Sequence, residues 1–290
     1  MTLQRKRIVL IPNTEKKIDP AWLSGVVWHL HDLGCELRAF EKSRSMLADS
    51  SDNIMFSDDK DAVYTGADLL LVFGGDGSII RAARSSAGWE IPIAGINCGR
   101  LGYLADLEQN ETDLLDAILA GEGIIERRIM LDAQILREDR IIGVDTPALN
   151  DIVLTNGPLP KLLSFELYCN GEPVEHCYAD GMILAAPTGS TAYSMSAGGP
   201  ILDPCLNCIC ATPICPQTMN NRPVIFSGDS VLEFRNIVTR GNTAFVSIDG
   251  QESIMLHPED TVRIFRSPYS TKLIRIKRGG FLSALRKRLS

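Results

Sequence analysis

Short apolar segments and amphipathic segments alternate along the first 120 residues of the chain. Residues 8–11 and 37–40 read as strands, and residues 21–33 between them read as a helix. This alternation predicts a parallel sheet covered by helices. The clearest strand is Asp68–Phe73, whose apolar run ends in glycines, as expected for a strand buried on both faces.

Two glycine-rich turns follow strands of this predicted sheet. The first is Gly74-Gly75-Asp76-Gly77, after which residues 78–87 read as a helix. The second spans residues 97–102 and follows the predicted strand Ile91–Ile96.

The hydrophobic pattern changes after residue 123. Apolar residues recur at alternate positions from Ile129 to Ile135, which predicts strands. Asn170-Gly171 and Asp249-Gly250 each lie between strand-like segments and predict hairpin turns. Phe281–Leu289 reads as a short basic amphipathic helix that docks on the first domain.

We therefore predict an α/β N-terminal domain with a Rossmann-like parallel sheet and a β-rich, β-sandwich-like C-terminal domain. The predicted α/β domain spans residues 1–123 and carries the Gly-Gly-Asp-Gly loop. The β-rich domain spans residues 124–268, and residues 269–290 form a C-terminal segment that returns to the first domain.

Composition narrows the class of protein. With 290 residues and 45% hydrophobic content, the chain accommodates two domains with separate cores. Its formal net charge of -7 argues against binding nucleic acid by overall attraction, so a phosphate-bearing ligand needs a local site. No apolar stretch approaches the roughly 18 residues that cross a bilayer. Eight cysteines without a secretory signal indicate reduced thiols, so we expect a soluble, cytoplasmic protein that does not bind membranes.

Asp76 is the candidate catalytic residue. It follows a strand of the predicted sheet at the carboxyl edge, where open α/β sheets bind ligands. Glycines let a phosphate or ribose approach the backbone, and the free amides at the start of the next helix attract anions. A carboxylate repels phosphate, but in phosphoryl transfer it accepts the proton of the attacking hydroxyl while Mg²⁺ and cationic side chains compensate the charge.

The same turn also has a purely structural interpretation. In that interpretation the glycines take positive φ and Asp76 caps the following helix. Arg81, one turn into that helix, either faces a phosphate or lies in solvent. The residues around Asp76 leave both interpretations open.

A second candidate segment is Asp180–Ile201. An apolar strand, Met182–Ala186, leads to a turn rich in small hydroxyl residues and then to Tyr193. Such a surface can hydrogen-bond the edge of a base while an aromatic side chain packs nearby. The alternative is a structural loop with Tyr193 in the core, and composition alone favours it.

In order and spacing, these segments resemble the NAD kinase family, the ATP- or polyphosphate-dependent NAD kinases. The resemblance spans about Ile8 to Gln251, and the run Pro187–Tyr193 is highly specific to the family. The matching segments are Gly74–Ser78, Gly95–Leu104, Leu149–Asp151, Asp180–Ile201, Thr212–Pro216 and Asp249–Gln251.

The resemblance implies transfer of the γ-phosphoryl of ATP, or of another polyphosphate donor, to the 2′-hydroxyl of the adenosine ribose of NAD, which gives NADP. Asp76 is the implied general base. The expected substrate-binding residues are Gly75, Gly77, Arg81, Asn150, Asp151, Lys161, Tyr178, Asp180, Thr191, Ala192, Tyr193, Ser194, Ser196 and Gln251.

Within this set the resemblance gives some residues separate roles. Asn150 and Asp151 match a pair that holds the adenine and ribose, and Asp180 matches an aspartate that contacts the nicotinamide half. Residues 191–196 match the base-binding segment. Relatives vary at Lys161 and Tyr178, and Tyr178 departs from the basic residue common near that position.

The resemblance further implies Mg²⁺ or another divalent cation with ATP, NAD as substrate, and a homodimer or homotetramer. It does not distinguish ATP from polyphosphate, or NAD from NADH. We predict no resident metal site, because the thiol spacing of Cys205, Cys208, Cys210 and Cys215 lacks a second paired motif. The basic run from Lys272 to Arg288 is expected to form a solvated face.

Three other functions compete with NAD phosphorylation. A dehydrogenase is disfavoured because neither Gly-x-Gly-x-x-Gly nor Gly-x-x-x-x-Gly-Lys-Ser/Thr occurs. A lipid or sugar-phosphate kinase shares Gly-Gly-Asp-Gly but does not explain Pro187–Tyr193. A non-catalytic nucleotide sensor predicts NAD binding without turnover, and the intact Asp76 argues against it.

Overall fold

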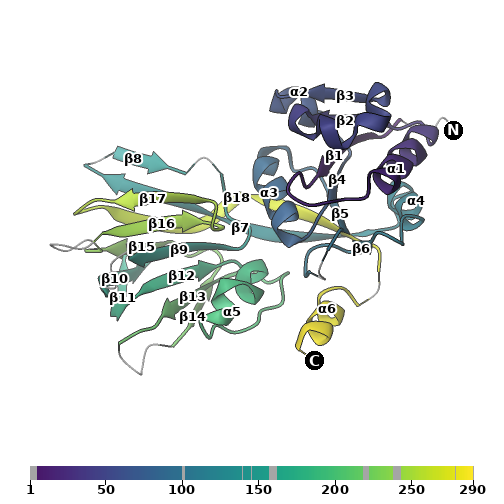
Figure 1. The fold of residues 1–290 in the computed structure, drawn as a ribbon. Helices are drawn as coiled ribbons and strands as arrows, with labels where there is room; N and C mark the ends of the chain where they lie inside the picture. Colours follow the sequence, from purple (N-terminus) through teal and green to yellow (C-terminus); the bar gives the residue numbers. More distant parts are fainter. Residues whose placement is uncertain are drawn as a thin grey trace. The chain divides into compact units, whose positions relative to one another are not determined.

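The computed structural model of the chain describes residues 5–99, 102–138, 140–144, 146–156, 162–217, 222–237, 243–277 and 279–289. The chain divides into two compact units. Unit 1 comprises the residues up to Arg127 and those from Thr271 onward, and unit 2 comprises Arg128–Ser270. Both junctions fall inside long strands, β7 (Ile124–Arg137) and β18 (Thr261–Arg275), which are labelled in Figure 1.

Unit 1 is built on a parallel sheet with the strand order β5-β4-β1-β2-β3. The end of β18 joins it beside β5, where Leu273 pairs with Ile93. The strands are β1 (Arg7–Pro12), β2 (Glu36–Phe40), β3 (Ile54–Ser57), β4 (Leu69–Phe73), β5 (Ile93–Asn97) and β6 (Leu107–Glu108), the last parallel to β5.

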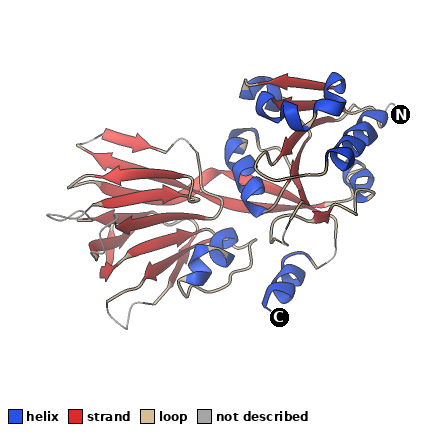
Figure 2. Ribbon diagram, viewed as in Figure 1, coloured by secondary structure: helices blue, strands red, loops and turns tan. Residues whose placement is uncertain are grey.

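Helices cover both faces of this sheet (Figure 2). Leu23 and Val27 of α1 and Leu115 of α4 share a core with one face of the strands. Ile79 of α3 packs on Gly95, which points to the opposite face. The helices are α1 (Pro20–Asp32), α2 (Lys60–Tyr64), α3 (Asp76–Ser85), α4 (Leu114–Leu119) and α6 (Gly280–Leu289), with short 3₁₀ helices η1 (Glu41–Met46), η2 (Ala48–Asn53) and η3 (Ala87–Trp89).

The strand order reverses between β1 and β4. The chain runs outward from β1 through β2 to β3, and then returns to β4 on the other side of β1. The segments that follow β1 and β4 therefore lie side by side. Asn13 N–H donates to the Phe73 carbonyl at 2.9 Å, and the Asn13 amide nitrogen contacts the Ser78 hydroxyl at 2.9 Å. Open α/β sheets bind ligands in the crevice at such a reversal.

Unit 2 is a sandwich of two sheets. One contains β11-β10-β15-β18 with β7 and β8, and the other has the order β14-β13-β12-β9-β16-β17. Phe165 and Phe234 of the first sheet share one core with Leu154 and Leu184 of the second. The elements not yet given are β8 (Arg140–Gly143), β9 (Asp151–Asn156), β10 (Leu163–Cys169), β11 (Glu172–Ala179), β12 (Gly181–Ala185), η4 (Pro187–Thr191), α5 (Tyr193–Ser196), β13 (Cys208–Ile214), β14 (Val224–Ser227), β15 (Leu232–Arg235), β16 (Ala244–Ile248) and β17 (Glu252–Leu256).

This architecture confirms the predicted fold class, a parallel α/β domain and a β-rich sandwich. Both predicted hairpins are also confirmed. Asn170-Gly171 joins β10 to β11 and Asp249-Gly250 joins β16 to β17, and all four residues have positive φ, as a type I′ turn requires. Among the described residues, no helix has the length and apolar character needed to span a membrane.

The expectation of a solvated basic run after residue 272 is wrong for its described strand residues. Arg275 is only 5% exposed, and Lys272 pairs with Glu90 at 3.3 Å. The reason is tertiary, because β18 enters the sheet of unit 1 beside β5 and its alternate side chains point inward.

Candidate active site

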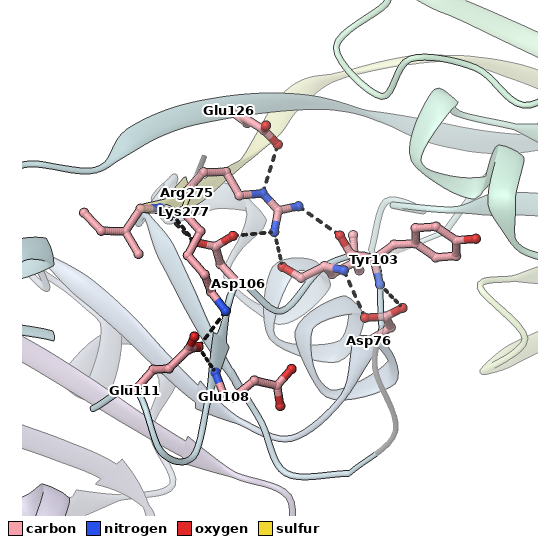
Figure 3. Close-up of polar contacts among 10 residues, drawn as sticks. Asp76, Tyr103, Asp106, Glu108, Glu111, Glu126, Arg275 and Lys277 are labelled. Atoms are coloured by element: carbon pink, nitrogen blue, oxygen red, sulfur yellow. Dashed lines mark hydrogen bonds and ion pairs between the residues drawn. The ribbon is translucent and has the colours of Figure 1, made fainter. Parts of the chain in front are cut away.

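Asp76 is the first residue of α3, and its carboxylate reaches the second glycine-rich turn. One oxygen accepts the Tyr103 N–H at 2.8 Å and the other accepts the Leu104 N–H at 3.0 Å (Figure 3). Gly75 is the N-cap of α3, with φ of −100° and no side-chain capping bond. The interpretation of Asp76 as a helix cap in a positive-φ turn is therefore wrong.

The glycines of both turns make room for charged side chains. A Cβ atom on Gly102 would lie 1.9 Å from an Asp76 carboxylate oxygen. Cβ atoms on Gly75 and Gly99 would lie 3.4 and 2.8 Å from the Lys16 ammonium. The two turns thus pack against Asp76 and Lys16 in a way that larger residues would obstruct.

Asp76 lines a cavity of about 680 Å³ at the reversal point of the sheet. Four cationic side chains line the same cavity, together with Glu15. They come from three separate segments: Lys16 and Lys17 follow β1, Arg81 lies on α3, and Arg288 lies on α6. Arg81 lines the cavity and is exposed, so its role as a phosphate contact stays a prediction. The excess of cations suits a ligand with several negative charges.

Helix α6 reaches this cavity through aromatic contacts. The Arg288 guanidinium lies 4.8 Å from the centroid of the Tyr103 ring, and the Phe281 ring lies 6.1 Å from the same ring. Arg288 thus approaches the turn that donates to Asp76, and the stacking holds its charge at the cavity.

Asp249 fixes the first of the unit 2 site segments. Its carboxylate accepts the N–H groups of Leu149 at 2.8 Å, Asn150 at 2.8 Å and Asp151 at 3.0 Å. The Asp151 carbonyl in turn accepts the Asp249 N–H at 2.9 Å. The β16–β17 turn therefore determines where Asn150 and Asp151 lie at the start of β9.

Asn150 also joins this segment to η4. Its carbonyl accepts the Ala186 N–H at 2.9 Å. A Cβ atom on Gly189 would lie 2.1 Å from the same carbonyl oxygen, so only glycine permits this approach. The structure thus brings together three of the segments singled out in the sequence, those around Asn150, Gly189 and Asp249.

Asp151 is 6% exposed, and burial raises its pKa to about 7, with the neighbouring Asp249 carboxylate adding to the rise. Removal from water disfavours the charged form, and a second negative charge does the same. A ligand that donates hydrogen bonds to Asp151 would favour its ionised form.

The hydroxyl-rich segment divides into buried and exposed positions. Ser194 is fully buried, and its hydroxyl contacts the Thr212 hydroxyl at 2.9 Å. Tyr193 is 45% exposed, so the interpretation that places it in the core is wrong. Thr191 and Ala192 are half-buried and Ser196 is exposed. The surface available to a ligand is therefore formed by residues 191–193 and Ser196.

Other expected residues lie apart from Asp151. Asp180 precedes β12, whose Ala185 pairs with Asp151 and whose Gly181 pairs with Thr155. Four residues of strand separate those positions, which is about 13 Å. Tyr178 lies beyond Asp180 on β11, and its ring is 4.7 Å from the His176 ring. Such a separation fits the two halves of a dinucleotide but not one small ligand.

The remaining expected residues are less informative. Gln251 is exposed at the end of the β16–β17 turn. Lys161 lies outside the described residues, as does Arg100. Cys208 and Cys210 are buried on β13, whereas Cys205 and Cys215 are exposed. Within the described part of the chain, no group of three or more His, Cys, Asp or Glu side chains is arranged to hold a metal ion.

Several residues of the site were missed from the sequence. Lys16 and Lys17 carried a usable signal, since they follow β1 directly at the reversal point of the sheet. Arg288 carried none, because a basic helix has a complete local explanation. Asp249 lies in the matching segment Asp249–Gln251, but as part of an Asp-Gly turn it was given no role of its own.

Comparison with known proteins gives the family. Residues 35–123 match the ATP-NAD kinase N-terminal domain, and residues 149–276 match the ATP-NAD kinase C-terminal domain. The chain is 41% identical to an NAD kinase of Symbiobacterium thermophilum over 224 residues, 77% of this chain and 78% of the relative. It is 36% identical to an NAD kinase of a Thermoanaerobacter species over 288 residues, 98% of this chain and 99% of the relative.

Two solved structures share the fold. Yeast NADH kinase complexed with NADH has a TM-score of 0.89 at 23% identity and covers 98% of this chain and 87% of its own. An NAD kinase of Archaeoglobus fulgidus in complex with ATP has a TM-score of 0.72 at 23% identity, with 98% of both chains covered. The fold and the sequence matches define a phosphotransferase with an α/β domain and a β-sandwich. The chain belongs to the NAD kinase family.

Proposed function

We propose that this chain phosphorylates NAD to NADP, and that Asp76 is the general base which accepts the proton of the 2′-hydroxyl of the adenosine ribose. The γ-phosphoryl comes from ATP or another polyphosphate donor. The observation that carries the proposal is the position of Asp76, a fixed carboxylate in a cavity lined by four cationic side chains.

Asp76 keeps the capacity to accept a proton. Each of its oxygens accepts one backbone N–H, whereas a carboxylate offers about four acceptor positions. The two bonds hold the carboxylate in one orientation and leave a lone pair on each oxygen for the ribose hydroxyl. A base held at hydrogen-bond distance contributes about 10² to 10⁴ in rate.

The donor phosphates bind in the cavity of unit 1 in this proposal. Lys16, Arg81 and Arg288 approach it from different segments, so they can surround a triphosphate. The start of α3 adds backbone amides, which favour anions. The positive charge lies where negative charge moves during the transfer, and this lowers the barrier.

NAD contacts the unit 2 segments that are fixed around Asn150. Asp151 accepts from ribose hydroxyls, residues 191–193 with Ser196 contact the base, and Asp180 contacts the nicotinamide half. The roughly 13 Å of strand between Asp151 and Asp180 supports an extended dinucleotide.

Mg²⁺ or another divalent cation enters with the donor. Among the described residues, no three His, Cys, Asp or Glu side chains are arranged to hold a metal ion, so the ion is proposed to come with the donor. A cytoplasmic location and a homodimer or homotetramer complete the proposal. The eight cysteines, all free thiols, support the cytoplasmic location, and the exposed apolar side chains Ile124, Ile141 and Met255 support the oligomer.

The test is an assay for NADP after incubation with NAD, ATP and Mg²⁺, beside the same assay with Asp76→Asn. We expect NADP from the wild type and a loss of about 10² to 10⁴ in kcat for the variant. Polyphosphate in place of ATP and NADH in place of NAD identify the donor and acceptor.

Two results would contradict different parts of the proposal. NAD binding with no NADP under any donor would identify a non-catalytic sensor. Full activity of Asp76→Asn would overturn the base assignment and leave the reaction standing. Mass in solution, measured by light scattering, tests the oligomer.

A further inference from the structure

Arg275 lies one peptide away from the candidate base. It is the last residue of β18 and is 5% exposed. Its guanidinium donates to the Leu104 carbonyl at 2.8 Å and to the Tyr103 carbonyl at 3.0 Å. Figure 3 shows the backbone at Tyr103 between the Arg275 guanidinium on one side and the Asp76 carboxylate on the other.

One peptide group connects the two charged side chains directly. The Tyr103 carbonyl and the Leu104 N–H belong to the same peptide, so the group that accepts from Arg275 also donates to Asp76. A hydrogen bond to a carbonyl polarises the N–H of its peptide and strengthens the next bond in the chain. The peptide's position and its polarity therefore both depend on Arg275.

We propose that Arg275 is a positioning residue for the phosphoryl transfer, which holds the Tyr103–Leu104 peptides so that their N–H groups orient the Asp76 carboxylate. The inference rests on the proposed role of Asp76 as base. Arg275 touches neither substrate nor reacting atoms in this account and acts only through that backbone segment.

Two carboxylates hold the guanidinium in place. Arg275 Nε donates to Glu126 at 3.1 Å, and Asp106 lies 3.8 Å from Nη1. Asp106 also accepts the N–H groups of Ile276 at 2.8 Å and Lys277 at 3.0 Å. Two sets of contacts thus fix the segment that carries Tyr103 to the end of β18: the bonds of Arg275 to its carbonyls and the bonds of Asp106 to the next two N–H groups. A planar guanidinium with several donors suits this arrangement, and an ammonium group does not.

The competing explanation is a structural role, in which Arg275 only ties β18 to the rest of unit 1. That role predicts a loss of stability when the buried ion pair is broken. Under the structural role, the effect of an Arg275 substitution on the rate does not depend on whether Asp76 is present. Under the positioning role it does. Arg275→Lys separates the two because it keeps a cation near Asp106 and Glu126 but cannot reproduce the planar fork.

The matched control is Arg137→Lys. Arg137 donates to both oxygens of Asp260, at 2.9 and 2.7 Å, and lies in unit 2. The substitution is the same Arg-to-Lys change and removes a bidentate pair with a carboxylate, without changing the Tyr103–Leu104 segment.

We expect Arg275→Lys to lower kcat about 100-fold, the effect of a misplacement near 1 Å. Its NAD dissociation constant, measured by calorimetry, should stay close to that of the wild type. Arg137→Lys should leave kcat unchanged.

A double-mutant cycle with Asp76→Asn decides the issue. If Arg275 acts through Asp76, Arg275→Lys has little further effect on the residual rate of Asp76→Asn. An equal fold-loss in both backgrounds, or a wild-type kcat for folded Arg275→Lys, overturns the inference. Full activity of Asp76→Asn instead overturns the base assignment on which it rests.

If Arg275→Lys does not fold, Glu126→Gln replaces it in the same cycle. This variant keeps a hydrogen-bond acceptor for Arg275 Nε but removes a charge that orients the guanidinium. The expected result is a smaller fall in kcat that again disappears beside Asp76→Asn, and additivity again overturns the inference.

Discussion

Asp76 in unit 1 and Asp249 in unit 2 make the same local contact. Each carboxylate accepts consecutive backbone N–H groups from a segment far away in the sequence, two for Asp76 and three for Asp249. Their surroundings differ. Asp76 lines a cavity with four cationic side chains, whereas Asp249 lies beside the buried Asp151.

The comparison shows that carboxylate–amide contacts serve two purposes in one chain. In unit 1 the amides orient the carboxylate, which is itself the proposed general base. In unit 2 the carboxylate orients the amides, and the residues that carry them are the proposed ligand contacts. The predictions below test this distinction, from the largest expected effect to the smallest.

Gly102→Ala should move the Asp76 carboxylate. The new Cβ would lie 1.9 Å from a carboxylate oxygen, and the short side chain can swing away at little cost in stability. We expect kcat to fall about 100-fold, because moving a catalytic group by about 1 Å is enough to cause a loss of that size. Steady-state kinetics measure kcat. The control is Gly25→Ala in α1, where the added Cβ would meet no atom within 4 Å. An unchanged kcat for folded Gly102→Ala would mean that the orientation of Asp76 is unimportant.

Asp249→Ala should act on stability and NAD affinity. It removes the acceptor of three N–H groups, and we expect the free energy of unfolding to fall by about 2 kcal/mol. Asp76→Ala should cost less, because Asp76 accepts two N–H groups where Asp249 accepts three. Urea denaturation and calorimetric titration with NAD check both variants. Equal losses of stability would remove the distinction between the two carboxylates.

The Asp151 carboxyl should make the stability of the ligand-free protein depend on pH. Its pKa is about 7 when folded and about 4 when unfolded, so between these values the folded state binds more protons. The free energy of unfolding therefore falls as pH rises from about 4 to 7, by up to about 1.4 kcal/mol per unit, and levels off above. Asp151→Asn should flatten this part of the curve in urea denaturation between pH 5 and 8. A slope that survives in Asp151→Asn would assign the dependence to another group.

Lys16→Met should weaken the donor site by the smallest amount. Lys16 is exposed, and a solvent-screened charge contributes about 1 kcal/mol. We expect KM for ATP to rise about fivefold with the NAD dissociation constant unchanged. Lys60→Met, at the exposed start of α2, is the control. A change in NAD affinity instead of KM for ATP would place the donor elsewhere.

The sequence by itself determined the class of each domain and the position of Asp76. The apolar run ending at Phe73 must be a buried strand because it has no polar face, and the glycines after it leave only one carboxylate in the turn. The Asn-Gly and Asp-Gly pairs likewise determined two hairpin turns, because few other residues adopt the positive φ that such turns require. These features depend on neighbours in the sequence.

Only the tertiary structure decided which distant residues complete each site. Arg275 and Asp249 each have an ordinary local explanation, a basic strand residue and a turn residue. Their proposed roles follow from partners 171 residues away at Leu104 and about 100 residues away at Leu149. Such contacts depend on strand order and register, which set where β18 and the β16–β17 turn lie. No local pattern encodes that placement, so the sequence pointed to Asp76 and the fold supplied the residues that hold it.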